Sequence, residues 1–598
     1  MSDNEKRSGR ITFEKISVRF FTALFLNCVL FLILYRPLSF ADRSFFGQVR
    51  ILPFLGAFAG FYAALTVLFT LIDSLRTERL ILLLSYTVYA LFTSFQTDNI
   101  WFGFGACLIL LVICVYVFKD CEAPLTRFGI PLWALFAAAA AAGLYLALFT
   151  GIQTVCRYLT QSTPNYDFGI FSQMFYYMKN TLQPLVTSER DVLMSHFAVH
   201  FSPIFYLFLP FYAIFPSPAT LMVCQALLLA SGVVPVVMIC KKIGLSNKSS
   251  ALFAVLYALY PAVAGGCFYD LHENKFLLPL LLWLFFFIIK NKWYGIGVFS
   301  LLVMLVKEDA AVYTAFTGVY VLFSAVKKDK LKGLAMLCSS AVYFITVTFL
   351  LNRYGEGTMD TRFVNFMSDQ TDGLINVVAN VIKDPAYVVH QMFDQTNTGI
   401  FENRIEFLLR MMLPVGALPL ITKKLHRYIL ILPLVLINLM PDYVYQHSIF
   451  FQYTYGPFAF LLFAAILNYA DMSGRIRRTV GVFAVAASMT VCAQSVWCRN
   501  DYFASYINER RYYDSVRIMI ESIPEEASVS SDTFYCATAS RRRVLYDISE
   551  TDHITETDYV ILDLRTESGR EKSDVFEYDP GYERYYGIDG RIAIYRKK

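Results

Sequence analysis

Acidic and histidine residues gather in a few polar segments of this sequence, each lying between long apolar runs. The first segment places Asp167 among aromatic neighbours, in the stretch between Asn165 and Gln173. A carboxylate beside a membrane with aromatic neighbours can have a raised pKa and act as a general base. The alternative is that Asp167 caps a helix predicted over residues 168–178, because acidic residues are common at helix starts.

Two histidines follow Asp167 in the same segment. His196 and His200 are four residues apart and would share one face of a helix. Binding of a metal ion is one interpretation of this pair, but two histidines without a carboxylate at fixed spacing are a weak indication of a zinc site. Contact with a phosphate or a substrate is the second interpretation, and packing at the membrane interface is the third.

Further polar segments interrupt the apolar runs later in the chain. The acidic and basic residues of these segments are Asp270, His272, Glu273, Lys307, Glu308, Asp309, Asp442 and His447. The group at 270–273 could bind a divalent ion or a sugar hydroxyl, or form an ordinary polar loop. The three adjacent charges at 307–309 are costly beside a membrane unless they are paired or used. Four cations could offer positive charge to a lipid phosphate: Lys275, Lys307, Arg404 and Arg410.

The composition shows which class of protein carries these residues. The chain has 598 residues, of which 57% are hydrophobic and 17% charged, whereas soluble domains carry roughly 25% charged residues. This excludes a set of soluble domains and a disordered chain. The net charge of +5 is small and the basic residues lie between apolar runs, which favours membrane topology signals over nucleic-acid binding. No Walker loop, serine-hydrolase elbow or His-Glu-x-x-His motif occurs, so nucleotide hydrolysis and zinc proteolysis have no support.

The apolar runs predict an all-α polytopic membrane bundle with about fifteen spans. The predicted spans are 16–36, 51–72, 79–95, 100–118, 128–150, 217–240, 249–268, 276–290, 293–306, 309–326, 332–351, 404–422, 425–440, 449–470 and 479–497. Alternate loops are rich in Lys and Arg, which places these loops and the N-terminus in the cytoplasm. Residues 197–215 are apolar but carry two prolines, and crossing there would reverse every later loop. We therefore expect this segment to lie along the outer interface.

Three long stretches then lie on the outer face: 151–216, 352–403 and 498–598. The last is polar and predicts a helix over 511–522 and strands over 527–530, 544–546, 559–564 and 592–595. We expect additional N-terminal spans in 1–127, a membrane core in 128–497 and a small extracytoplasmic α/β domain in 498–598. The expected location is the plasma membrane, with the N-terminus in the cytoplasm.

The polar segments also carry a resemblance to a known family. The sequence resembles the membrane proteins called domain of unknown function 2079 over roughly residues 130–565. The resemblance rests on an ordered series of motifs: Tyr166–Gln173, His200–Pro203, Phe215–Pro218, Tyr260-Pro261, Asp270–Glu273, Lys307–Asp309, Asn438–Tyr443 and Gln452–Tyr455. One departure is that Glu273 follows His272 directly, where that family often has a proline before the glutamate.

That family is more remotely similar to the GT-C superfamily of membrane glycosyltransferases. The resemblance implies a GT-C-like core that moves a sugar from a polyprenyl-phosphate donor to an acceptor at the outer membrane surface, with Asp167 as the catalytic base. It implies substrate contacts from Tyr166, Gln173, His196, His200, Asp270, His272, Glu273, Lys307, Glu308, Asp309 and Asp442. Lys275, Arg404 and Arg410 would contact the lipid phosphate, and a divalent metal is an optional cofactor. A transporter or lipid flippase, and a non-catalytic membrane scaffold, are the alternatives.

Overall fold

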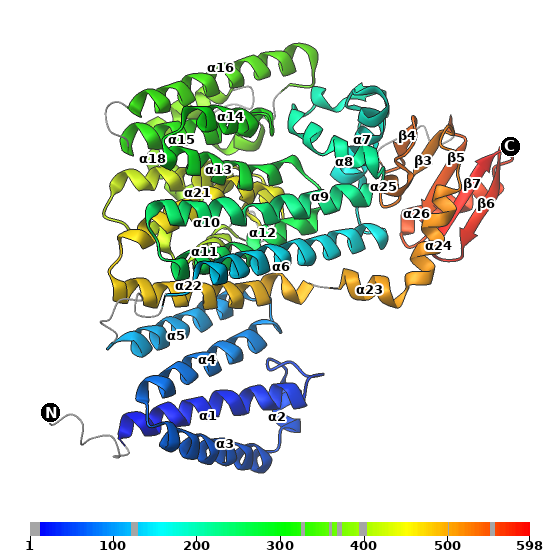
Figure 1. Cartoon of the computed structure of the whole chain (residues 1–598). Coiled ribbons are helices and arrows are strands. Elements are labelled where there is room, and N and C mark those ends of the chain that lie inside the picture. The colour runs from blue at the N-terminus through cyan, green and yellow to red at the C-terminus, as the bar shows by residue number, and fades with distance from the viewer. Residues whose placement is uncertain are drawn as a thin grey trace.

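The computed structural model is built mostly of helices, with one small sheet near the C-terminus (Figure 1). The described residues are 12–120, 129–324, 329–357, 361–367, 373–393, 403–499, 501–549 and 556–598. Parts of the predicted outer stretch 352–403 therefore lie outside the described residues.

The N-terminal helices form a group at the bottom of Figure 1. They are α1 (Phe13–Leu34), α2 (Arg43–Gln48), α3 (Ile51–Ile72), α4 (Leu75–Ser94) and α5 (Ile100–Phe118). The side chains of Ser74 and Asn99 cap α4 and α5 by accepting backbone N–H groups. A buried ion pair of 2.8 Å between Arg19 and Glu78 joins α1 to α4. The outward faces of these helices are apolar, which suits a lipid environment.

The core of the molecule runs from α6 to α22. Its helices are α6 (Leu132–Leu159), α7 (Ile170–Thr181), α8 (Leu209–Ile214), α9 (Pro218–Ser231), α10 (Val233–Ile243), α11 (Asn247–Ala258), α12 (Pro261–Gly265), α13 (Leu277–Lys290), α14 (Trp293–Met304), α15 (Ala311–Ser324), α16 (Lys330–Tyr354), α17 (Leu374–Lys383), α18 (Pro385–Phe393), α19 (Arg404–Met412), α20 (Leu432–Leu434), α21 (Tyr455–Asp471) and α22 (Gly474–Ser495). One large buried hydrophobic cluster holds most of these helices together.

Eight helices among the described residues are long and apolar enough to cross a membrane. They are Phe13–Leu34, Ile51–Ile72, Ile100–Phe118, Leu132–Leu159, Pro218–Ile243, Asn247–Tyr269, Lys330–Tyr354 and the helix that begins at Gly474. A multi-pass membrane protein is thus supported, while the number of fifteen spans stays a prediction. The helix expected over 128–150 runs nine residues further, to Leu159.

Prolines explain where the predicted spans are not continuous helices. Residues 404–422 form α19 and then two short 3₁₀ turns that contain Pro414 and Pro419, because proline removes a helix donor and clashes with the preceding turn. Residues 197–215 likewise form only short helices, including Pro203–Leu207 and α8. The expectation that this segment lies along the outer interface and does not span stays a prediction.

The C-terminal residues form a five-stranded sheet with the order β4-β3-β5-β7-β6. Its strands are β3 (Val529–Ser531), β4 (Leu545–Asp547), β5 (Tyr559–Asp563), β6 (Tyr582–Ile588) and β7 (Ile592–Lys597), and its helices are α23 (Tyr502–Asn508), α24 (Arg510–Glu521), α25 (Cys536–Ala539) and α26 (Glu567–Tyr578). The four expected strands and the helix at 511–522 are present. Strand β6 and helix α26 were not expected, because their sequences are polar and carry only weak periodicity.

This C-terminal unit packs on the segment that follows α6 (Figure 1). Thr187 accepts the backbone N–H of Leu545 at 2.9 Å and donates its hydroxyl to the Leu545 carbonyl at 2.8 Å. The backbone N–H of Asn165 donates to the Thr533 hydroxyl at 2.9 Å. The sheet therefore holds the loop that carries Asp167, through contacts on both sides of that residue.

Candidate functional site

Three polar segments form the first turns of three helices. A π-turn, Asn165–Gly169, leads into α7, and 3₁₀ turns at Glu273–Phe276 and Glu308–Ala310 lead into α13 and α15. Each turn carries an acidic residue, which the positive end of the helix dipole stabilises. The chain thus places carboxylates at helix starts, where they are not forced into the apolar middle of the bundle.

Asp167 lies inside the π-turn and does not cap a helix. The residue at the N-cap of the π-turn is Pro164 and that of α7 is Gly169, and neither helix start has a side-chain cap bond. The capping interpretation of Asp167 is therefore wrong. The Oδ2 atom of Asp167 is buried and receives no hydrogen bond from any residue that the structure describes. One carboxylate oxygen is left available to accept a proton.

The turn around Asp167 requires glycine at position 169. A Cβ atom on Gly169 would lie 2.2 Å from Oδ1 of Asn165. The Asn165 side chain cannot move freely, because its amide nitrogen donates to the Ser188 carbonyl at 2.8 Å. These contacts explain why the turn holds Asp167 in one orientation.

The surroundings of Asp167 change its proton affinity. Burial raises the pKa of Asp167 to about 7, and the negative charge of Glu273 acts in the same direction. A hydrogen bond from Tyr269 and the positive charges of Lys307 and His196 lower the pKa in part. Asp167 can therefore exchange a proton close to neutral pH, as a general base must.

Glu273 and Lys307 form a buried ion pair beside Asp167. The Lys307 nitrogen lies 3.2 Å from Oε1 of Glu273. Burial lowers the pKa of Lys307, but the negative charges of Glu273, Glu308 and Asp309 outweigh burial and raise it above its ordinary value. Lys307 is therefore a permanent cation in the site.

His196 pairs with a carboxylate that the sequence patterns did not single out. Its Nδ1 atom lies 2.9 Å from Oε2 of Glu189, and its Nε2 atom is buried without a hydrogen-bond partner among the described residues. Burial lowers the pKa of His196, but the charge of Glu189 outweighs burial and raises the pKa. The same interaction lowers the pKa of Glu189, despite its burial.

The other two histidines of the site are held neutral. The Nδ1 atom of His200 lies 2.9 Å from Oε1 of Glu308, and the backbone N–H of Asn274 donates to Nδ1 of His272 at 3.2 Å. Burial, followed by the positive charge of Lys307, moves the pKa of both His200 and His272 well below the ordinary value. Because Nδ1 of His272 accepts a hydrogen bond, this ring carries its proton on Nε2.

The histidine rings connect these groups into one cluster. The ring centroids of His196 and His200 are 6.1 Å apart. The Phe171 ring lies edge-on to His196 at 5.2 Å and to His272 at 6.1 Å. The residues that the structure brings together, called here the polar cluster, are Asp167, Glu189, His196, His200, His272, Glu273, Lys307 and Glu308.

Asp270 is held by an arginine from α6. Arg157 donates to both carboxylate oxygens of Asp270, at 2.6 and 3.3 Å, and also to the Tyr502 hydroxyl at 2.5 Å. The backbone of Asp270 has a φ of +69°, which is costly for a residue other than glycine. The Arg157 pair fixes this strained position, so Asp270 anchors its loop.

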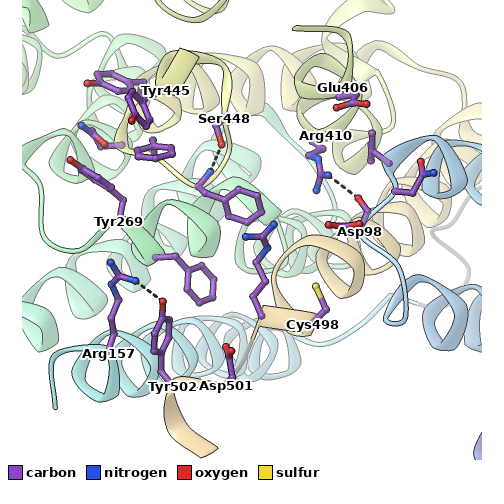
Figure 2. A pocket seen from close by; sticks show the side chains of 18 of the residues that line it. Asp98, Arg157, Tyr269, Glu406, Arg410, Tyr445, Ser448, Cys498, Asp501 and Tyr502 are labelled. Atoms are coloured by element: carbon purple, nitrogen blue, oxygen red, sulfur yellow. Dashed lines mark hydrogen bonds between the residues drawn. The ribbon is translucent and has the colours of Figure 1, made fainter. Parts of the chain in front are cut away.

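Figure 2 shows a large cavity whose wall includes two neighbours of Asp167, Tyr166 and Tyr269. Its volume is about 1310 Å³. In Figure 2, Arg157, Tyr269 and Tyr502 lie on the left, while Arg410, Glu406 and Asp98 lie on the right. Several further aromatic side chains contribute to the wall: Trp101, Tyr443, Tyr445, Phe450, Phe451 and Tyr453.

The cavity wall carries three arginines (Arg157, Arg410 and Arg499) and three carboxylates (Asp98, Glu406 and Asp501). Arg499 lies over the Phe450 ring at 4.1 Å and is exposed in the cavity wall. Arg410, on α19, donates to the Ser495 hydroxyl at 2.7 Å and to the Asp98 carbonyl at 3.0 Å. Arginines among aromatic rings suit a ligand that combines an anionic group with sugar-like faces.

The structure separates some expected residues from the polar cluster. Gln173 accepts the backbone N–H groups of Thr187 and Ser188 and donates to the Arg542 carbonyl, so it braces the segment between α7 and α8. Asp442 is exposed. Arg404 donates to the Pro441 carbonyl at 2.9 Å. Gln173 and Arg404 form hydrogen bonds with backbone groups, and Asp442 faces solvent. The three residues are not part of the polar cluster.

Two expected residues, Lys275 and Asp309, interact with residues of the polar cluster but are not part of it. Lys275 is fully buried, and its ammonium group makes no hydrogen bond to a described residue. Burial lowers the pKa of Lys275, and Asp270 and Asp167 are close enough to raise it in part. Asp309 is exposed and interacts with Lys307.

Within the described ranges, no group of three or more His, Cys, Asp or Glu side chains is arranged to hold a metal ion. His196 and His200 each direct Nδ1 to a different carboxylate, which explains why their spacing does not create a shared ligand pair.

Sequence patterns missed Glu189, Arg157 and Tyr269. Glu189 lies beside Arg190 in an ordinary polar stretch, and no local pattern indicates its partner. Arg157 was expected in an outer loop but lies in the last turn of α6. A longer prediction for α6 would have identified Arg157 as a cation at the end of a span, since residues 151–159 continue the helical period.

One comparison with known proteins agrees with this membrane architecture. A family model described as a predicted membrane protein, DUF2079, matches residues 157–586. The match begins near the end of α6 and includes the polar cluster and most of the C-terminal sheet. No curated protein matches the chain. The chain belongs to the DUF2079 family of membrane proteins.

Proposed function

We propose that this protein is an integral membrane glycosyltransferase of the GT-C type, which moves a sugar from a polyprenyl-phosphate donor to an acceptor at the outer membrane surface. The observation that carries the proposal is Asp167. Its carboxylate has a pKa of about 7, has one oxygen without a described hydrogen-bond partner, and lies beside a cavity of about 1310 Å³.

Asp167 acts as the general base in this proposal. The acceptor hydroxyl oxygen bonds to the anomeric carbon of the sugar, and its proton moves to the Asp167 carboxylate. The bond between the anomeric carbon and the phosphate oxygen breaks, and the polyprenyl phosphate leaves with the bonding electrons. This displacement inverts the anomeric centre.

The cavity supplies the charge and the room that the reaction needs. Arg499 and Arg410 lie in its wall and can stabilise the negative charge that develops on the leaving phosphate. Pockets that hold a single drug-sized ligand measure roughly 300–1,000 Å³, so the larger cavity has room for a donor head group and part of an acceptor. The aromatic side chains of the wall can stack on sugar rings.

The test is transfer by purified protein in lipid nanodiscs, with a panel of radiolabelled polyprenyl-phosphate sugars. Release of polyprenyl phosphate is measured for wild type and Asp167→Asn. Loss of a general base lowers the rate by about 10²–10⁴-fold, so we expect at least about a hundredfold decrease with normal expression. The matched control is Asp574→Asn, an exposed carboxylate on α26. An Asp167→Asn protein that transfers sugar at the wild-type rate would contradict the proposal.

A further inference from the structure

A second cavity lies at the other end of the bundle from Asp167. Its volume is about 530 Å³, and it opens between the α13–α14 connection, the start of α16 and the residues before α20. Helix α13 begins beside Glu273 and ends at Lys290 after 14 residues. At about 1.5 Å per residue, this helix separates the two sites by about 20 Å. We call the second cavity the basic-end pocket.

Three cations line the basic-end pocket: Lys332, Lys424 and Arg427. Lys332 pairs with Asp329 at 3.0 Å, while Lys424 and Arg427 share Asp471 at 2.9 and 2.8 Å. Three positive charges thus meet two negative charges. The pocket keeps a surplus of positive charge.

Arg427 also has a hydrogen-bond donor that is not used within the part of the chain that the structure describes. The residue is 5% exposed, and its Nε–H has no hydrogen-bond acceptor among the described residues. Its other contacts are Asn468, at 2.9 Å, and Asp471. A buried guanidinium donor without an acceptor is costly, and Arg427 is one of the residues that line the pocket.

Most of the remaining wall of the pocket is apolar, although Asn291, Ser324 and His426 also line it. Ile288, Ile296, Val321, Phe463 and Leu467 line it, together with Tyr320. The basic-end pocket therefore combines a cationic rim with a hydrocarbon wall. This combination matches an amphiphile with an anionic head and an apolar chain, and basic pockets between membrane helices bind such lipids.

We propose that the basic-end pocket binds the phosphate group of an anionic phospholipid, with the lipid chain along its apolar wall. The lysine and arginine side chains donate charge-assisted hydrogen bonds to the phosphate oxygens. This site is independent of the transfer reaction proposed for Asp167, because it uses different residues at the opposite end of α13.

The test is native mass spectrometry of the full-length protein in detergent, with added dioleoylphosphatidylglycerol. Dioleoylglycerol offers the same chains without phosphate, and inorganic phosphate offers the anion without chains. We expect the phospholipid to bind most tightly. Each lysine contributes a factor of about five to anionic-lipid affinity, so Lys424→Gln should weaken binding about fivefold and Lys332→Gln/Lys424→Gln about 25-fold.

The matched control is Lys290→Gln, which removes a charge from the same end of α13 without touching the pocket lining. Lys424→Gln keeps the test valid if the double variant does not fold, because Lys424 is half-exposed. Equal affinity for dioleoylglycerol, or equal weakening by Lys290→Gln, overturns the proposal. Binding of inorganic phosphate as tight as that of the phospholipid assigns the pocket to a soluble phosphate compound and also overturns it.

Discussion

The Lys307 nitrogen lies 3.2 Å from a carboxylate oxygen of Glu273, and both residues are buried. This pair joins the turn before α15 to the turn before α13. Its two charges act on Asp167 in opposite directions, because Glu273 raises the pKa of Asp167 and Lys307 lowers it. Burial is the largest cause of the raised pKa of Asp167, and the two charges of the pair adjust that pKa in opposite directions.

The first prediction concerns the pH dependence of transfer. Only the ionised form of Asp167 can accept a proton, so the rate should rise with pH and level off above the pKa of about 7. Below this value we expect a decrease of about tenfold per pH unit. The measurement is initial transfer rate between pH 5 and pH 9. A rate that is flat across this range excludes Asp167 as the base.

The second prediction is that removal of the charge of Glu273 and removal of the charge of Lys307 shift this pH profile in opposite directions. Glu273→Gln removes a negative charge near Asp167, so the pKa of Asp167 should fall and the rising limb should shift to lower pH. Lys307→Gln removes a positive charge and should shift the limb to higher pH. The pH–rate profiles of both variants are compared with that of Glu571→Gln, an exposed carboxylate on α26. Shifts in the same direction for both variants contradict the assignment.

The third prediction concerns stability. Removal of one partner from a buried ion pair costs about 3–5 kcal/mol, because the other charge stays buried without compensation. Lys307→Met and Glu273→Gln should each lower the free energy of unfolding by about this amount, and the double variant should lose less than the sum. Thermal unfolding in detergent measures the three variants. Additive losses would show that the two charges do not interact.

The fourth prediction uses the His196–Glu189 pair. The pKa of His196 is raised, so its contribution to stability is complete below the unfolded value of 6.5 and is lost as pH rises through the folded pKa. The pKa of Glu189 is lowered, so its contribution is complete above 4.5 and is lost as pH falls through the folded pKa. The pair therefore stabilises the protein most between pH 4.5 and 6.5.

Glu189→Gln tests this pH window. The difference in melting temperature between wild type and the variant should be largest near pH 5.5 and should shrink above neutral pH. Glu571→Gln serves again as the control. A difference that is constant with pH indicates that Glu189 acts through packing and not through its charge.

The fifth prediction is that Gly169→Ala disrupts the turn that carries Asp167. The new Cβ would lie 2.2 Å from the Asn165 side chain, which is held by the Ser188 carbonyl. Overpacking of this kind costs about 1–3 kcal/mol of the free energy of unfolding. We expect the protein to remain folded while its transfer rate decreases. Gly297→Ala on α14 is the control, because a Cβ there has no neighbour within 4 Å. Full activity of Gly169→Ala shows that the turn tolerates the change.

The sequence predicted the membrane bundle and the four polar segments for a direct physical reason. A bilayer excludes charge from its apolar interior, so runs of apolar residues become buried or lipid-facing helices and charged residues collect at their ends. Asp167, Glu273 and Glu308 are therefore recognisable as candidates from their positions alone. The strands β3, β4, β5 and β7 were predictable as well, because their apolar runs are short and bounded by polar residues.

Only the tertiary structure decided which side chains are partners. Arg157 and Asp270 are 113 residues apart, and His200 and Glu308 are 108 residues apart. No local pattern encodes such pairs, since they depend on which helix ends pack together. The same packing made Gln173 a brace and left Asp442 in solvent. The residue types at the site are fixed by local sequence, whereas their charges, partners and access to the cavity arise from the assembled bundle.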